Sequence, residues 1–193
     1  TYTCSKCGET KTEPIPALGH DYVDGVCSRC GAAEPADETF ERVTSDLTDW
    51  SGTYLIVHEL DNDKAKVFSG VGTAKNYVIA DVTDNKIVKD EAMTAPTVTI
   101  AAIDGGYSIK VGDKYMGGKS DSNTIVLAGT EQLNTISYDK TTDRVKIVSN
   151  TATLRFNTNE GDSQDRFRYY KSGSGGSFPL VSLYKLSDGG ETP

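Results

Sequence analysis

The chain has 193 residues, of which 20 are Lys or Arg and 28 are Asp or Glu, so its formal net charge at pH 7 is −8. This length exceeds the roughly 100–150 residues of a usual domain and favours two parts. Because the chain is acidic and has no run near the roughly 18 apolar residues of a membrane span, we expect no nucleic-acid partner and no membrane insertion.

Four cysteines near the start form two similar motifs. Cys4 and Cys7 belong to Cys-Ser-Lys-Cys-Gly, and Cys27 and Cys30 belong to Cys-Ser-Arg-Cys-Gly, with nineteen residues between the pairs. Two such pairs can bring four thiolates to one tetrahedral ion, and thiolates favour zinc over hard cations. The site leaves no open coordination position, so the spacing predicts a zinc-ribbon-like module over residues 1–36 with one structural zinc.

Two alternatives remain open for this module. Outside the cell the thiols could oxidise, and Cys4–Cys27 with Cys7–Cys30 would then be the sensible pairing. His20 could replace a cysteine as a ligand, donate to a cysteine sulfur, or simply be exposed.

The segment 12–31, which contains Gly-His-Asp-Tyr before its cysteine pair, resembles short cysteine and Gly-His repeats of large surface proteins of gut Firmicutes. In those proteins the repeat occurs in tandem beside adhesive or catalytic domains. The resemblance implies a spacer or stalk on a bacterial cell surface.

Residues 37–187 contain short runs rich in Val, Ile, Thr, Tyr and Phe, separated by Gly, Asn, Asp and Ser turns. No stretch has sustained helical periodicity, so we expect an all-β domain. The runs repeat as three units of four strands. The twelve predicted strands are 54–57, 66–70, 76–80 and 96–100, then 107–111, 114–118, 124–127 and 134–138, then 145–148, 153–157, 166–170 and 179–185.

A threefold four-strand repeat is what a β-trefoil requires, and closing a sheet removes its exposed edges. The first unit is longer because of residues 81–90, which we interpret as an added hairpin or loop. The alternative is a β-sandwich, which the same number of strands permits. The polar tail, residues 188–193, is typical of a linker, and we expect the chain to be a piece of a longer protein.

The stretches 40–43, 52–57, 154–157, 166–172 and 181–186 resemble an accessory domain appended to secreted hydrolases and surface proteins of gut bacteria. The resemblance implies an extracellular accessory module and gives it no established ligand.

Catalytic patterns are lacking in the predicted β domain. His58 is its only histidine, and no serine stands in a nucleophile-elbow setting, so we expect no enzyme. Asp61 and Asp63 could bind calcium, although acidic hairpin turns are common.

We therefore expect a binding role, and sugars are the ligands that such modules commonly bind through an aromatic platform and polar side chains. In the strand 166–170, Phe167 and Tyr169 share one face, while Arg166, Arg168 and Tyr170 share the other. If Phe167 is in the core, Tyr170 is exposed beside two arginines and could contact a glycan. It could equally cover the barrel while the arginines pair with acidic neighbours such as Asp162 and Asp165.

Trp50 precedes the first predicted strand and is either a plug of the core or a sugar platform. The chain lacks the Gln-x-Trp motif of ricin-type lectins. The sequence thus predicts a non-catalytic region of a bacterial cell-surface or secreted protein: a lectin-like, carbohydrate-binding module for glycan or mucin, with a zinc-stabilised spacer. The alternative is a structural or protein-binding spacer that contacts neighbouring domains.

Overall fold

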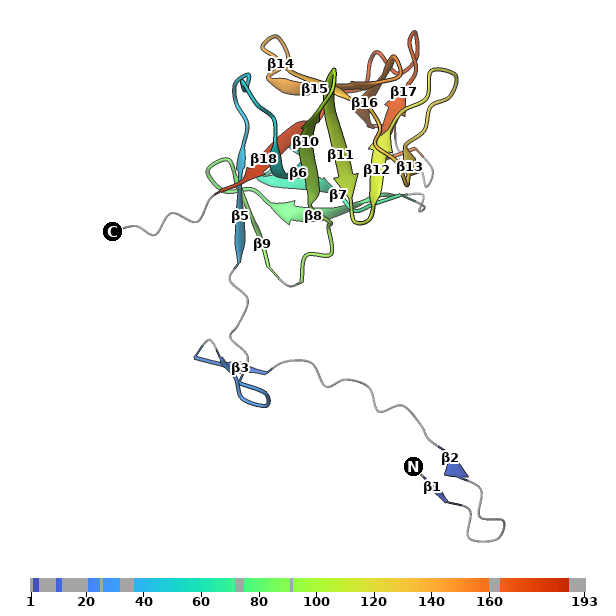
Figure 1. Cartoon of the computed structure of the whole chain (residues 1–193). Helices are drawn as coiled ribbons and strands as arrows, with labels where there is room; N and C mark the ends of the chain where they lie inside the picture. Colours follow the sequence, from blue (N-terminus) through green and yellow to red (C-terminus); the bar gives the residue numbers. More distant parts are fainter. Residues whose placement is uncertain are drawn as a thin grey trace. The chain divides into compact units, whose positions relative to one another are not determined.

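The structure is a computed structural model of the chain, and it describes residues 2–3, 10–11, 21–24, 26–31, 37–71, 75–90, 92–159 and 164–187. The chain forms two compact units, Thr1–Ala36 and Asp37–Pro193 (Figure 1). These described residues contain no helix, so none could cross a membrane as a helix. All paired strands are antiparallel, and the prediction of an all-β chain is confirmed.

The first unit contains two short hairpins. Strand β1 (Tyr2–Thr3) pairs with β2 (Thr10–Lys11), and β3 (Tyr22–Val23) pairs with β4 (Val26–Cys27). The described strands of this unit have only two residues each, and strands so short bury little apolar surface.

The second unit contains fourteen strands among its described residues. Twelve of them overlap the twelve segments predicted from the sequence: β6 (Gly52–Glu59), β7 (Lys64–Phe68), β8 (Tyr77–Asp81), β10 (Val98–Ile103), β11 (Gly106–Val111), β12 (Lys114–Gly117), β13 (Val126–Ala128), β14 (Thr135–Asp139), β15 (Arg144–Ser149), β16 (Ala152–Asn157), β17 (Arg166–Tyr170) and β18 (Ser182–Leu186). The other two are β5 (Glu38–Arg42) and β9 (Lys86–Lys89).

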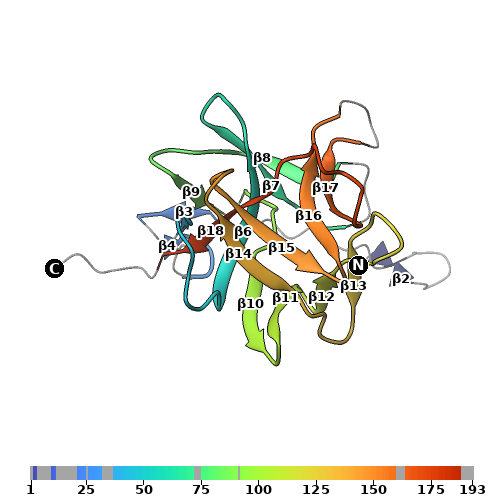
Figure 2. The ribbon, with the colours of Figure 1, turned by 90° about the horizontal axis from the view of Figure 1, so that it is seen from above.

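These strands form a ten-stranded and a four-stranded sheet. The four-stranded sheet, β14–β17, lies at the opposite end of the unit from β8 and β9 and faces the viewer in Figure 2 (Figures 1 and 2). Three isolated bridges, Tyr107 with Asn134, Val145 with Val181 and Arg155 with Leu180, link it to the larger sheet or to residues next to that sheet's strands.

A first apolar core lies between the two sheets. It contains side chains from nearly every strand of the three predicted units, with Phe156, Phe167 and Tyr169 among the largest that are fully buried. Phe156 and Phe167 meet edge to face, with ring centroids 4.8 Å apart. In β17, Phe167 and Tyr169 point into this core, as the alternation of side chains along the strand predicts.

A second apolar core was not predicted. Six strands follow one another by pairing in the order β8, β7, β6, β18, β5 and β9, and each contributes a side chain to this core: Ala80, Val67, Val57, Tyr184, Phe40 and Ile87. The residues 81–90, interpreted as an added hairpin or loop, therefore supply β9, whose partner is β5 rather than β8.

Strands β6 and β18 are shared by the two cores. Tyr54 and Ile56 of β6 point into the first core, and Leu55 and Val57 point into the second. A strand that is buried on both faces reads as a continuous apolar run, which is why residues 54–57 contain no polar group apart from the Tyr54 hydroxyl.

Candidate functional site

The cysteine module is described in part. Cys27 is buried at the end of β4, and Cys30 is exposed. The N–H of Gly31 donates to the carbonyl of Cys27 at 2.9 Å, and Gly31 has φ +73°, a conformation that glycine adopts without strain. A tight turn of this kind is compatible with a zinc knuckle, in which the cysteines on either side of the turn supply thiolate ligands. Cys4, Cys7 and His20 lie outside the described residues.

Tyr170 is buried rather than exposed, so of the two roles left open by the sequence the structure favours the covering one over the exposed glycan contact. Only 5% of the residue is accessible, although Phe167 and Tyr169 occupy the core face as expected. The residues that follow β17 fold back over the opposite face. The ring of Phe178 lies 5.1 Å from that of Tyr170, and Gly175 packs directly on the Tyr170 ring.

Arg166 and Arg168 lie half-buried on the same face of β17 as Tyr170. Burial, followed by the positive charge of Arg168, lowers the pKa of Arg166. Asp165, one of the predicted acidic neighbours, instead accepts hydrogen bonds from Lys66 at 2.8 and 3.0 Å and from the Tyr77 hydroxyl at 2.5 Å. Asp162, the other, lies outside the described residues.

Trp50 belongs to the first core and is 2% exposed. Its backbone N–H donates to the Tyr107 hydroxyl at 3.3 Å. Of the two roles left open by the sequence, the structure therefore favours the plug, because a buried indole presents no face to a sugar ring.

A network of hydrogen bonds and ion pairs joins four strands near the end of β6. The carboxylate of Glu59 accepts from Arg42 at 2.5 Å, from the Tyr184 hydroxyl at 3.0 Å and from Arg144. Arg144 also donates to Ser182 at 2.7 Å. Two guanidinium groups thus share one carboxylate, and burial with the positive charge of Arg42 lowers the pKa of Arg144.

His58 lies beside this network and stacks on Phe156, with ring centroids 4.2 Å apart and an interplanar angle of 7°. Burial first, and then the positive charges of Arg144 and Lys66, lower the pKa of His58 to about 4. The imidazole is therefore neutral at physiological pH and packs as an aromatic ring.

The turn that carries Asp61 and Asp63 has a structural role. Asp63 has φ +54°, and its carbonyl accepts from Val82 N–H at 2.9 Å. Within the described ranges, no three His, Cys, Asp or Glu side chains are placed to hold a metal ion.

A large hollow of the second unit lies where β8 and β9 diverge, and no prediction from the sequence concerned it. This hairpin groove, of about 840 Å³, is lined by residues 37, 39, 78–81, 83, 84, 86, 88, 90 and 92–94. Four of these residues are aspartates, Asp37, Asp81, Asp84 and Asp90, and one is a cation, Lys86. The lining side chains include no aromatic ring, histidine or cysteine.

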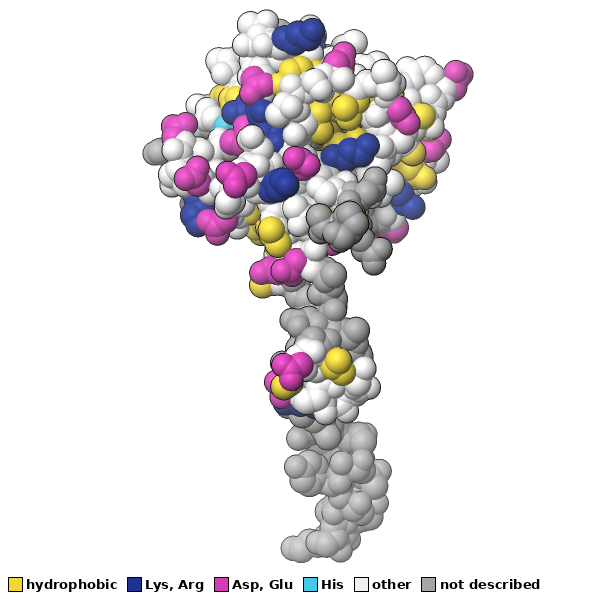
Figure 3. All heavy atoms as spheres, turned by 90° about the vertical axis from the view of Figure 1, so that its left-hand side faces the viewer, with side chains coloured by type: hydrophobic (Ala, Val, Ile, Leu, Met, Phe, Trp, Pro, Cys, Tyr) yellow, Lys and Arg dark blue, Asp and Glu magenta, His cyan; other side chains and the backbone are white. Residues whose placement is uncertain are grey.

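Exposed apolar side chains gather at this groove. The described part of the second unit exposes four large aliphatic side chains, Val71, Ile79, Val88 and Leu133, and two of these, Ile79 at 53% and Val88 at 52%, line the groove. Elsewhere the surface is mixed: in the view of Figure 3, acidic and basic side chains are interspersed over the face of this unit. Ile79 and Val88 thus form a small exposed aliphatic patch at the groove.

No family model matches the chain, and no curated protein and no solved structure matches it.

Proposed function

We propose that the chain is a non-catalytic accessory region of a larger bacterial cell-surface or secreted protein. In this proposal the first unit is a zinc-stabilised spacer, and the second unit is a β-trefoil that carries a binding site. The hairpin groove is the observation that carries the binding role, because it combines a volume in the range of ligand sites with exposed aliphatic side chains.

The β-trefoil assignment is supported by the order of strand pairing. Strand β6 pairs with β10, β10 with β11, β14 with β15, and β18 with β6. The bridges Tyr107 to Asn134 and Val145 to Val181 supply the links β11 to β14 and β15 to β18. These are the six neighbour relations of a trefoil barrel, and a sandwich has no need of them.

The spacer assignment is supported by the two Cys-x2-Cys-Gly motifs and by the turn at Cys27 and Gly31. A segment of some thirty residues with strands of only two residues cannot fold on an apolar core alone. A zinc ion held by Cys4, Cys7, Cys27 and Cys30 would supply that stability, with four thiolates and no open position for catalysis.

Between the two partner classes expected from the sequence, the groove favours a protein. Sugar sites place an aromatic ring against the pyranose, and no aromatic side chain lines the groove. Aliphatic side chains beside two strand edges suit an extended peptide instead.

Glycan binding is the second candidate, and the outer face of β17 supports it. Phe178 is half-buried and covers Tyr170, which shares this face with the half-buried Arg166 and Arg168. An aromatic ring near two guanidinium groups matches the chemistry of a sugar site, with Phe178 in the role first given to Tyr170.

Peptide and glycan arrays probed with the full chain distinguish these candidates. We expect binding to peptides that is lost in Val88→Asp and kept in Leu133→Asp, which changes an equally exposed aliphatic side chain outside the groove. Glycan signal that is lost in Phe178→Ala but kept in Val88→Asp would move the binding site to β17. Signal on neither array would overturn the binding role and leave a spacer.

A further inference from the structure

The hairpin groove is the gap in a sheet that is otherwise continuous around the second core. Strands β8 and β9 are the two ends of the six-strand order, and the two-residue turn Asp84-Asn85 joins them. Both turn residues have positive φ, 49° and 61°, as a type I′ hairpin turn requires. Only one pair, Thr83 with Lys86, closes the hairpin, with N–H to carbonyl distances of 2.9 and 2.8 Å.

Beyond this pair the two strands separate, because each is held by another neighbour. Strand β8 pairs with β7 along its whole length, and β9 pairs with β5. A regular hairpin would next pair Asp81 with Val88, and no such pair forms. Met93, whose side chain packs against the second core, lines the floor of the gap.

The register shows which backbone groups face the gap. Ser69 N–H donates to the carbonyl of Asn76, so alternate residues of β8 point their N–H and C=O toward β7, and Ile79 and Asp81 point theirs away. Arg42 N–H donates to the carbonyl of Asn85, so by the same alternation Val88 points its groups away from β5. By this register, the backbone groups of these three residues face the gap and not β7 or β5.

From this geometry we propose that the groove binds an extended, cationic segment of a protein partner by strand addition between β8 and β9. The inference rests on the proposed protein-binding function and specifies its mode. Backbone groups of Ile79 and Asp81 on one side and Val88 on the other would bond the added strand. Because β8 and β9 are antiparallel, the added strand would run antiparallel to one and parallel to the other.

The side chains around the gap define the sequence of the segment. Ile79 and Val88 lie exposed on the outer face of the two edges, where β-branched side chains of the added strand would pack. The groove carries four aspartates against one lysine, so its charge favours lysine or arginine in the partner. Strands β8 and β9 have only five and four residues, and short edges of this kind resist uncontrolled pairing.

The test uses the full chain and an eight-residue peptide of alternating valine and lysine, with hydrogen exchange measured residue by residue. We expect bound peptide to protect the amide protons of Ile79, Asp81 and Val88. The amides of Val78 and Ala80, which already face β7, should change little. A peptide with alternate amides N-methylated keeps every side chain and should bind much more weakly, because it lacks the N–H donors along one of its two edges.

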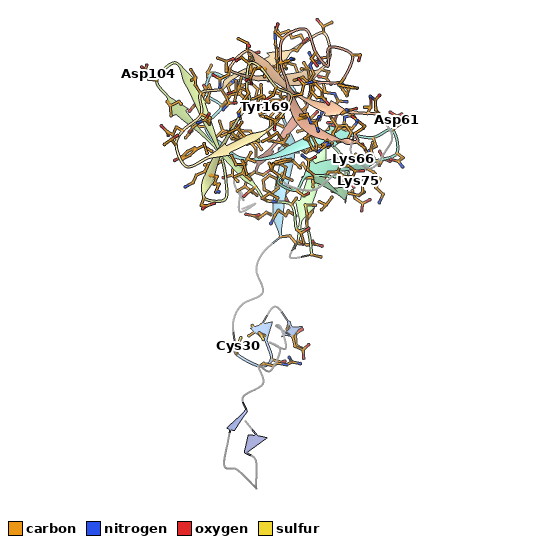
Figure 4. The ribbon with its side chains drawn as sticks, turned by 90° about the vertical axis from the view of Figure 1, so that its right-hand side faces the viewer. Cys30, Asp61, Lys66, Lys75, Asp104 and Tyr169 are labelled. Atoms are coloured by element: carbon orange, nitrogen blue, oxygen red, sulfur yellow. The ribbon has the colours of Figure 1, made fainter. Side chains whose placement is uncertain are left out.

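The charge requirement has its own matched pair of variants. The double variant Asp84→Asn with Asp90→Asn removes two negative charges from the groove. Asparagine at position 90 keeps an oxygen that accepts from the Met93 N–H, and asparagine at position 84 tolerates the positive φ of the turn. This variant should bind the peptide about threefold to tenfold more weakly. Asp104→Asn with Asp113→Asn changes the net charge equally on exposed turns outside the groove, and should leave affinity unchanged. Asp104 lies on the opposite side of the unit from Lys66 of β7 (Figure 4).

Each other outcome has a definite meaning. Equal binding of the N-methylated peptide, or binding without protection of the three amides, overturns strand addition while leaving the groove as a protein site. Equal binding of a valine–glutamate peptide overturns the cationic requirement. Binding of a glycan at these residues, or no perturbation of the groove by any peptide, overturns the proposed protein-binding function itself.

Discussion

Gly175 presses on the ring of Tyr170, and this contact explains the burial of the tyrosine. Gly175 has φ +67°, and a Cβ there would overlap the Tyr170 ring. We expect Gly175→Ala to destabilise the protein by about 2–4 kcal/mol, from strain at positive φ and from overpacking. Urea unfolding of the second unit measures this loss.

Gly173 provides the control for that substitution. It has φ +76° in the same loop, but a Cβ there would meet nothing within 4 Å. Gly173→Ala should therefore cost only the backbone strain, about 1–2 kcal/mol. Equal losses in the two variants would show that the loop does not pack on Tyr170 as described.

His58 should make stability depend on pH. Its pKa in the folded chain is about 4, against 6.5 for an ordinary histidine, so between these values the unfolded chain binds more protons. His58 therefore does not lower the free energy of unfolding above pH 6.5. As the pH falls from 6.5 toward 4, it lowers that free energy because only the unfolded chain gains the proton. Because the ring is partly exposed and screened, we expect about 1 kcal/mol between pH 7 and 5.

Urea midpoints at pH 7 and 5 measure this dependence. His58→Phe keeps a ring stacked on Phe156 and should remove most of the difference between the two midpoints. His20→Gln changes the only other histidine and should leave the difference intact. An unchanged pH dependence in His58→Phe would assign the effect to other groups.

At the scale of single residues, sequence parity predicted which side chains of β17 share a face, but not whether the outer face is exposed. Phe167 and Tyr169 had to point inward together because strand side chains alternate. Whether the opposite face stays exposed depends on a loop, residues 171–178, whose path follows from glycine conformations and not from periodicity. Strand parity alone says nothing about this loop, so it could not show that the face of Tyr170 is covered.

At the scale of elements, the Glu59 carboxylate joins β5, β6, β15 and β18 through Arg42, Arg144 and Tyr184. Its side chain is 19% exposed. Glu59→Gln would leave two neighbouring guanidinium groups without their shared anion. We expect a loss of about 2–3 kcal/mol in the free energy of unfolding.

The exposed pair of Lys64 and Asp81 is the matched control, since its side chains are 42% and 77% exposed. Asp81→Asn should cost less than about 1 kcal/mol, because water screens exposed ion pairs. Chemical denaturation of Glu59→Gln and Asp81→Asn gives the free energy of unfolding of each variant. If Glu59→Gln costs no more than Asp81→Asn, the network does not hold these strands together.

Strands β5 and β9 could not be predicted from the threefold repeat, because they lie outside it. One signal was present: residues 54–57 are apolar without alternation, which requires apolar partners on both faces of β6. The aromatic Phe40 and the aliphatic Ile87 satisfy that need in the second core. The gap between β8 and β9 exists because their pairing stops after Thr83 and Lys86. No local sequence pattern predicts where such pairing stops.

At the scale of the whole molecule, the two units differ in what can stabilise them. Both apolar cores are built from residues of the second unit, from Phe40 onward, and that unit can be stable on buried apolar surface. Nothing comparable exists among the described residues of the first unit, whose strands have two residues each. The proposed zinc ion therefore has a large effect on one unit and none on the other.

Metal removal tests this division of stability. Native mass spectrometry of the full chain should find one zinc ion, and a strong chelator should remove it together with the chemical-shift dispersion of residues 1–36. The urea transition of the second unit should not move, because neither core includes a residue of the first unit. Replacing the four cysteines by serine should reproduce the chelated state without added chelator. A chain that carries no metal and has lost four hydrogens would instead contain two disulfides, and the spacer would then owe its shape to covalent bonds.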